Sequence, residues 1–350
     1  MRLGRHDNNF DLIRFAAAAL VLFSHAYPLS GIGPEPILAL TGYESGGAIG
    51  VATFFVISGY LVAASYLRAN DLRQYARNRA LRIFPGLIVV VLLAIFGLGP
   101  IVTTLPAAEY FSDLTTWRYL GNAVMAINHN LPGVFLDNPF PKAVNGSLWT
   151  LPYEMTMYVG IGALGVLGLL GRRPAVAAVA AASLAIAIAV HYGWLVLPRL
   201  LGLADPNQFF KLGYFFFAGS LLYLLGDGLR YRWPIAAALT ALWVATFGTP
   251  VGWVVYLLAW PYLVIYLAQI PSRWAQRFGR YGDFSYGLYI YAFPIQQLLV
   301  WSRPWDNVHL YAAAAFCATL PFAVASWHLV EAPALQFKRR NIRPAVPAPG

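Results

Sequence analysis

The sequence predicts an all-α integral membrane protein that crosses the bilayer about ten times. Of its 350 residues, 59% are hydrophobic and 11% are charged, whereas soluble domains usually carry about 25% charged residues. The apolar residues also form runs of the length that spans a hydrocarbon core, which takes roughly 20 helical residues. We therefore expect one transmembrane domain over residues 1–337, followed by a basic, proline-rich cytoplasmic tail over residues 338–350.

Ten apolar runs are expected to form the transmembrane helices, and proline or glycine marks most of the junctions between them. The runs cover residues 10–30, 46–68, 81–103, 148–171, 174–197, 208–226, 232–248, 251–269, 282–302 and 308–332. Only one connection is long, the segment 104–147. It is expected on the outer face, where it can fold into a cap over the membrane domain.

The distribution of basic residues predicts the orientation. With a cytoplasmic N-terminus, eighteen Lys and Arg residues fall in cytoplasmic segments and five in outer segments, among them Lys211. This bias is the positive-inside pattern of an inner-membrane protein with both termini in the cytoplasm. The same pattern accounts for the net charge of +10, so no nucleic-acid partner is expected. Cys317 is the single cysteine and the six histidines are scattered, so no disulfide framework and no metal site are expected.

The first run carries ionisable residues, which are costly inside a membrane and indicate function. Arg14 and His25 are eleven positions apart, about three helical turns, so they share one face roughly 16 Å apart along the axis. Asp11 can pair with Arg14 across one turn. In an alternative interpretation, Asp11 and Arg14 form a structural pair at the interface and His25 only caps a neighbouring helix.

Three further polar elements are candidates for a site. Glu154 is expected at a depth similar to that of His25, where a carboxylate orients an imidazole for general-base catalysis; the alternative is a helix-locking ion pair. The segment 73–85 is predicted to be an inner loop, whose arginines either bind phosphate groups or only set the topology. Near mid-membrane, Ser58 offers a hydroxyl and Gly59 allows close helix approach.

Together these segments resemble the acyltransferase-3 family of membrane O-acyltransferases. The matching stretches are FDLIRFAAAALVLFSH, FFVISGYL, the pair Arg79-x-x-Arg82 followed by Ile-Phe-Pro, SLWTLPYE and FSYGLYIY, in the order of the family. They extend over about residues 8–335, nearly the whole chain. Many members have a histidine shortly after the last stretch, where this chain has Ala292 and then Gln296 and Gln297, so no role of that histidine is carried over.

The resemblance implies transfer of an acyl group, most often acetyl, from cytoplasmic acyl-CoA to a hydroxyl of a glycan, a lipid-linked sugar or a small metabolite. Acyl-CoA is then a donor substrate, and no permanently bound cofactor is expected. The implied roles are CoA-phosphate binding for Arg79 and Arg82, contact with the thioester end for Arg14 beside Asp11, general base or acyl carrier for His25, orientation of His25 for Glu154, and oxyanion donation for Ser58.

Two other classes of protein share the polar stripe of the first run. A transporter or flippase for a sugar-like solute would line its path with such residues, and in a membrane sensor the pair formed by Asp11 and Arg14 would be structural only. Cleavage of acyl-CoA by the purified protein distinguishes an acyltransferase from both.

Overall fold

The computed structural model describes residues 9–198, 205–229 and 231–337, and these ranges fold into helices without any extended strand. The longer helices are α1 (Phe10–Ser30), α3 (Gly46–Ala69), α4 (Leu72–Leu93), α8 (Leu151–Val166), α9 (Arg173–His191), α10 (Pro206–Leu225), α11 (Trp233–Ala245), α12 (Gly252–Gln269), α14 (Ser285–Ser302) and α15 (Val308–Ser326). The predicted tail, residues 338–350, lies outside the described residues. Residues 1–8, the N-terminal segment predicted to be cytoplasmic, lie outside them as well.

Short helices complete the described part of the chain. They are α2 (Pro36–Thr41), the π-helical turn Ala94–Leu98 with α5 (Gly99–Val102), α6 (Ala107–Ser112), α7 (Leu114–Arg118), α13 (Arg273–Phe278), and the π-helical turn Trp327–Glu331 with α16 (Ala332–Gln336). The described residues also form three 3₁₀ turns, Tyr119–Val124, Gly146–Thr150 and Gly226–Gly228. The turn Gly146–Thr150 leads directly into α8.

Seven described helices are long and apolar enough to cross a membrane. They are α1, α3, α4 with its continuation to Val102, α9, α10, α12, and α15 with its continuation to Gln336. Helices α8, α11 and α14 occupy the other three predicted runs. The all-helical, multi-pass architecture is confirmed, while the count of ten and the orientation stay predictions.

Helix α3 lies at the centre of the bundle, and it is the most buried of the seven candidate spans. Contacts link α9, α10, α3, α1, α14 and α15 in that order, each helix with the next. Helices α4 and α8 contact α3 and each other, while α11 and α12 pair beside α3 and α10. Helix α3 contacts both α1 and α10, so the ends of these three helices lie close together at each end of the bundle.

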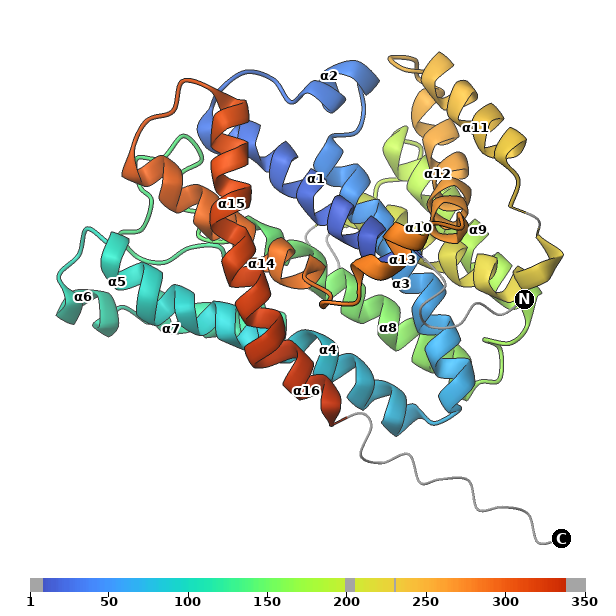
Figure 1. The fold of residues 1–350 in the computed structure, drawn as a ribbon, viewed down its shortest axis with the longest axis horizontal. Helices are drawn as coiled ribbons and strands as arrows, with labels where there is room; N and C mark the ends of the chain where they lie inside the picture. Colours follow the sequence, from blue (N-terminus) through green and yellow to red (C-terminus); the bar gives the residue numbers. More distant parts are fainter. Residues whose placement is uncertain (1–8, 199–204, 230, 338–350) are drawn as a thin grey trace, which may run out of the picture.

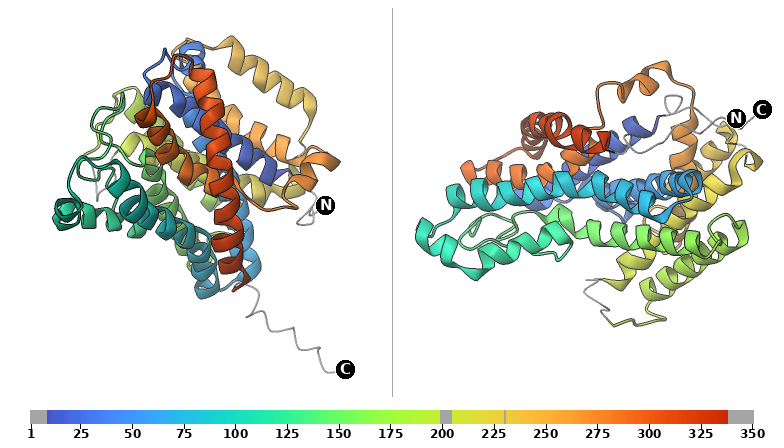
Figure 2. Two further views of the ribbon diagram at one scale, coloured as in Figure 1. Left: turned by 60° about the vertical axis from the view of Figure 1, so that its left-hand side comes forward. Right: turned by 90° about the horizontal axis from the view of Figure 1, so that it is seen from below.

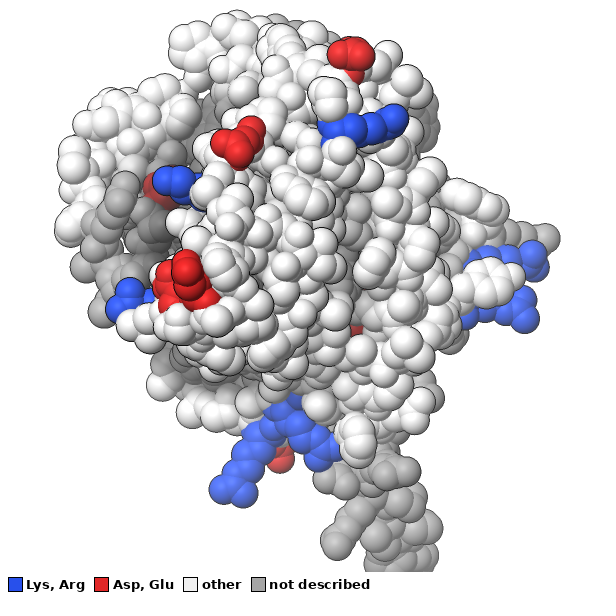
Figure 3. All heavy atoms as spheres, turned by 90° about the vertical axis from the view of Figure 1, so that its left-hand side faces the viewer, with Lys and Arg blue, Asp and Glu red and all other residues white. Residues whose placement is uncertain are grey.

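One face of the molecule is largely uncharged. In Figure 3 a broad white surface separates the few Lys, Arg, Asp and Glu side chains of that face. Lipid tails offer no partner to a charged group, so such a surface suits the hydrocarbon core.

Glycine brings α3 and α10 into close contact, as predicted for Gly59. A β-carbon on Gly59 would overlap the carbonyl oxygen of Phe216, and one on Gly219 would overlap that of Val56. The hydroxyl of Ser220 donates to the carbonyl oxygen of Gly59 at 3.0 Å. Small residues at such a crossing let two backbones approach and gain dispersion contacts.

The prediction of an inner loop over residues 73–85 is wrong. Helix α4 begins at Leu72, and the carboxylate of Asp71 caps it by accepting from the backbone N–H of Gln74 at 2.8 Å. Arginine is a good helix former and aspartate a good N-cap, so this polar stretch extends the apolar helix by more than two turns. As a result, Arg79 and Arg82 lie one turn apart on the same helix face.

Lys211 is buried inside α10, although it counts as an outer-segment residue in the charge distribution. Its ammonium group lies 2.8 Å from Glu44 Oε1, which also accepts from Trp253 Nε1 at 3.0 Å. The two charges compensate each other, so Lys211 tells nothing about topology. The pair fixes the start of α10 against the segment before α3.

The glutamines that follow Ala292 have structural partners. Gln297 Nε2 donates to the carbonyl oxygens of Phe140 and Ala143, at 2.7 and 2.8 Å, and Gln296 Nε2 donates to that of Leu22 at 2.9 Å. They join α14 to the segment 104–147 and to α1.

Candidate functional site

Two cavities open at opposite ends of the bundle. The larger has a volume of about 1780 Å³ and the smaller about 160 Å³. Each of the helices α1, α3 and α10 contributes one end to the large cavity and the other end to the small one: Arg14 and His25 of α1, Ser65 and Ala48 of α3, and Leu225 and Gln208 of α10. The polar stripe predicted on the first helix is therefore divided between the two cavities.

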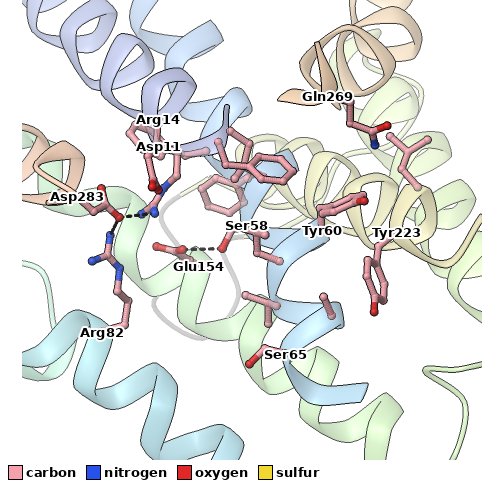
Figure 4. A pocket seen from close by; sticks show the side chains of 18 of the residues that line it. Asp11, Arg14, Ser58, Tyr60, Ser65, Arg82, Glu154, Tyr223, Gln269 and Asp283 are labelled. Carbon is pink, nitrogen blue, oxygen red and sulfur yellow. Dashed lines mark hydrogen bonds and ion pairs between the residues drawn. The ribbon is translucent and has the colours of Figure 1, made fainter. Parts of the chain in front are cut away.

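A carboxylate shared by two arginines lies in the large cavity. Asp283 Oδ2 is 2.6 Å from Arg14 Nη1 and 2.6 Å from Arg82 Nη2, as Figure 4 shows, and Arg82 Nη1 is 3.5 Å from Glu331 Oε2. Two guanidinium groups therefore converge on one carboxylate oxygen, where their positive charges offset its negative charge.

This cluster joins four segments that are distant in sequence. Arg14 comes from α1, Arg82 from α4, Asp283 from the residues just before α14, and Glu331 from the end of the π-helical turn Trp327–Glu331. Such turns, often found at functional sites, change the direction in which the next side chains point. Sequence reasoning missed Asp283 and Glu331; the available signal was that each is one of only fourteen acidic residues in a strongly apolar chain.

Arg79 differs from Arg82 in its partners. Its guanidinium carbon lies 5.6 Å from the centre of the Tyr158 ring, a cation–π contact, while its buried Nε has no hydrogen-bond partner among the described residues. Arg79 also lines the large cavity. Arg79 Nε is thus not engaged by a described residue, whereas Arg82 already serves two carboxylates.

Glu154 lines the same cavity and accepts two hydrogen bonds on one oxygen. Ser58 Oγ donates to Glu154 Oε1 at 2.9 Å, and the hydroxyl of Tyr158 donates to the same oxygen. In Figure 4 the side chains of Ser58 and Glu154 point toward each other from α3 and α8. Since the proton of Ser58 is directed at Glu154, the geometry gives no support to the oxyanion role predicted for Ser58.

His25 lines the small cavity. Its buried Nδ1 has no hydrogen-bond partner among the described residues, and its ring contacts that of Phe293 edge-on at 5.5 Å. Trp149, Gln208 and Lys211 line the same space. A buried imidazole nitrogen without a partner is costly, which makes it a natural contact for a ligand.

The structure brings some of the predicted residues together and separates others. Asp11, Arg14, Ser58, Arg79, Arg82 and Glu154 all line the large cavity, and His25 lines the small one. The expected pairing of Glu154 with His25 is not formed among the described contacts, because Glu154 is directed at Ser58 and Tyr158. Arg14 contacts Asp283, a partner that the sequence analysis did not suggest, and its pairing with Asp11 stays a prediction.

Comparison with known proteins agrees with these features. A family model described as an acyltransferase domain matches residues 7–328. The chain is 31% identical over 333 residues to an O-acetyl transferase of Shigella phage Sf6, covering 93% of this chain and 95% of the relative. It is 29% identical over 360 residues to nodulation protein 10 of Rhizobium leguminosarum bv. viciae, covering 95% and 94%. No solved structure matches the chain.

The family model covers the helix with Arg14 and His25, the arginines of α4, Glu154 of α8, and Asp283 with α14. All groups that line the two cavities and carry chemistry therefore fall within the matched region. This chain belongs to the acyltransferase-3 family of membrane acyltransferases, and it is an acyltransferase.

Proposed function

We propose that the protein is an inner-membrane O-acyltransferase that moves an acetyl group from cytoplasmic acyl-CoA to a hydroxyl of a glycan, a lipid-linked sugar or a small metabolite. The observation that carries the proposal is the pair of cavities: one large and lined with arginine, the other small and lined with histidine, with Val51 and Tyr289 lining both. The acetyl group and the hydroxyl acceptor are also in keeping with the O-acetyl transferase of phage Sf6.

The donor binds in the large cavity in this proposal. Arg79 lines this cavity with an Nε that has no described hydrogen-bond partner, and a planar guanidinium matches a phosphate oxygen pair. Tyr223 and Tyr266 line the cavity as well and suit stacking of the adenine ring. Arg82 acts through Asp283, so it positions Arg14 and α14 and does not meet the phosphates itself.

The acceptor hydroxyl binds beside His25. The imidazole takes the hydroxyl proton while the oxygen attacks the thioester carbonyl carbon; the C–O bond forms, the C–S bond breaks, and CoA leaves as the thiol once it has gained the proton. Direct transfer needs no acyl-histidine intermediate. Glu154 lies on the donor side, where its carboxylate orders Ser58 and Tyr158.

Release of CoA thiol tests the proposal. Protein purified in detergent is expected to cleave acetyl-CoA, faster when an envelope extract of the native cell supplies the acceptor, and radioactive acetyl should appear in that extract as an alkali-labile ester. A transporter or flippase for a sugar-like solute would bind the extract without producing thiol. Absence of both thiol and labelled ester with folded protein would exclude the acyltransferase mechanism proposed here.

A further inference from the structure

The two cavities share two lining residues, which together we call the wall. Among the residues of the described chain that line a cavity, Val51 of α3 and Tyr289 of α14 line both. Arg14, Arg79 and Glu154 are on one side of this wall, and His25 is on the other. A thioester held in the large cavity therefore reaches the imidazole pocket only past Val51 and Tyr289.

Both wall residues are held in place. The hydroxyl of Tyr289 donates to the carbonyl oxygen of Ser147 at 2.9 Å and lies 2.7 Å from Thr150 Oγ1, at the start of α8. Its ring packs edge-on against Phe54 at 5.7 Å. Val51 follows Gly50, where a β-carbon would collide with α1 at the carbonyl oxygen of Ala17, so this part of α3 lies directly against the first helix.

The space beyond the wall is small. Its volume of about 160 Å³ is the share of roughly five water molecules, at about 30 Å³ each in the liquid. It must take the acceptor hydroxyl with its carbon and also the part of the acyl group that lies past the carbonyl. Since packed interiors do not yield easily to added methylenes, a longer acyl chain competes with the acceptor for this space.

We infer that Val51 and Tyr289 determine the acyl-chain length that the enzyme transfers, by limiting the passage between the donor cavity and the His25 pocket to short acyl groups. This inference rests on the proposed function. The inference adds a specificity-determining wall to the proposed function. The two wall residues neither bind the CoA phosphates nor take the proton of the acceptor hydroxyl. Widening the wall should let longer acyl groups reach His25 together with the acceptor.

The test is the ratio of transfer rates from hexanoyl-CoA and acetyl-CoA, measured as labelled ester formed in the native envelope extract. The parent is expected to use acetyl-CoA at least about tenfold faster, since a methylene or two in a tight apolar site changes rates by about 10- to 200-fold. Val51→Ala should raise the hexanoyl-to-acetyl ratio about tenfold. Tyr289→Leu, which removes the ring and its two hydrogen bonds, should raise it too.

Val62→Ala is the matched control, because Val62 is a buried valine of the same helix that lines only the large cavity. Its ratio should equal that of the parent. Because Tyr289→Leu risks misfolding, Val51→Ala with a parental yield of folded protein is the variant that tests whether the wall limits acyl-chain length. The inference is wrong if folded Val51→Ala keeps the parental hexanoyl-to-acetyl ratio, or if Val62→Ala raises that ratio equally, even where acetyl transfer proceeds. If the parent protein transfers no acetyl group at all, the proposed function itself is refuted.

Discussion

Replacing His25 by glutamine is expected to lower acyl transfer by roughly 10²-fold or more, while binding of acyl-CoA stays at the parental value. Glutamine resembles histidine in size but takes no proton at neutral pH, and general-base catalysis contributes typically 10²- to 10⁴-fold. Binding is unaffected because His25 lines the small cavity, away from the arginines. The measurements are the rate of ester formation and the dissociation constant of acyl-CoA, each on protein of normal folded yield.

His309→Gln is the control for this experiment, since His309 is exposed on α15 and does not line either cavity. It should retain the parental rate. If His25→Gln also retains most of that rate, the imidazole is structural, and the catalytic assignment fails.

The same assay tells whether Glu154 acts with His25 or apart from it. The sequence favoured a unit, in which the double variant is little slower than the slower single variant. The structure places the two groups in different cavities without a described shared partner, and independent sites contribute additively in free energy. We therefore expect the rate losses of His25→Gln and Glu154→Gln to multiply in the double variant; a double variant equal to the worse single one would restore the pairing.

Neutralising Arg79 is expected to weaken acyl-CoA binding by about tenfold or more, with a larger loss at low ionic strength. Arg79 lines the large cavity, and its Nε has no described hydrogen-bond partner. Salt screens charge attraction over roughly 10 Å at 0.1 M, so lower salt enlarges the difference. The measurement is the acyl-CoA dissociation constant of Arg79→Gln against salt concentration, with Arg73→Gln as the control because Arg73 is an exposed residue of the same helix outside the cavity.

Arg82→Gln should behave differently. Removing this guanidinium leaves Asp283 and Glu331 short of a partner, and breaking a buried ion pair costs about 3–5 kcal/mol. The expected result is a lower yield of folded protein and a lower melting temperature.

Equal acyl-CoA affinity of Arg79→Gln and the parent at low salt would return Arg79 to a role in topology only.

The sequence predicted the helices better than the neighbours of their side chains. Apolar length and the charge distribution gave the runs, because the bilayer restricts spanning segments to helices of a set length. The same reasoning failed at residues 73–85, where a polar surface helix has no apolar length to reveal it. Gly59 was predicted correctly, since a glycine within an apolar run has few uses other than close packing.

The site was predicted in composition but not in arrangement. Position along a helix gives only the approximate depth of a side chain: Glu154, expected at a depth similar to that of His25, lies in the first turn of α8 and lines the other cavity. Depth does not tell which neighbour a side chain faces, and Glu154 is directed at Ser58. Asp283 lies 269 positions from Arg14 and depends on the packing of α14 against α1, which only the folded chain provides.

The central claim is that a donor at the arginine end of the bundle serves an acceptor at the histidine end. The measurement is radioactive acetyl transfer in proteoliposomes in which the protein has a single known orientation, with acetyl-CoA supplied on one side and the envelope extract on the other. We predict labelled ester when acetyl-CoA is on the side of Arg79 and the extract is on the side of His25, and little label in the reverse arrangement. Equal labelling in both arrangements of sealed vesicles, or labelling only when donor and acceptor share one side, would contradict the account.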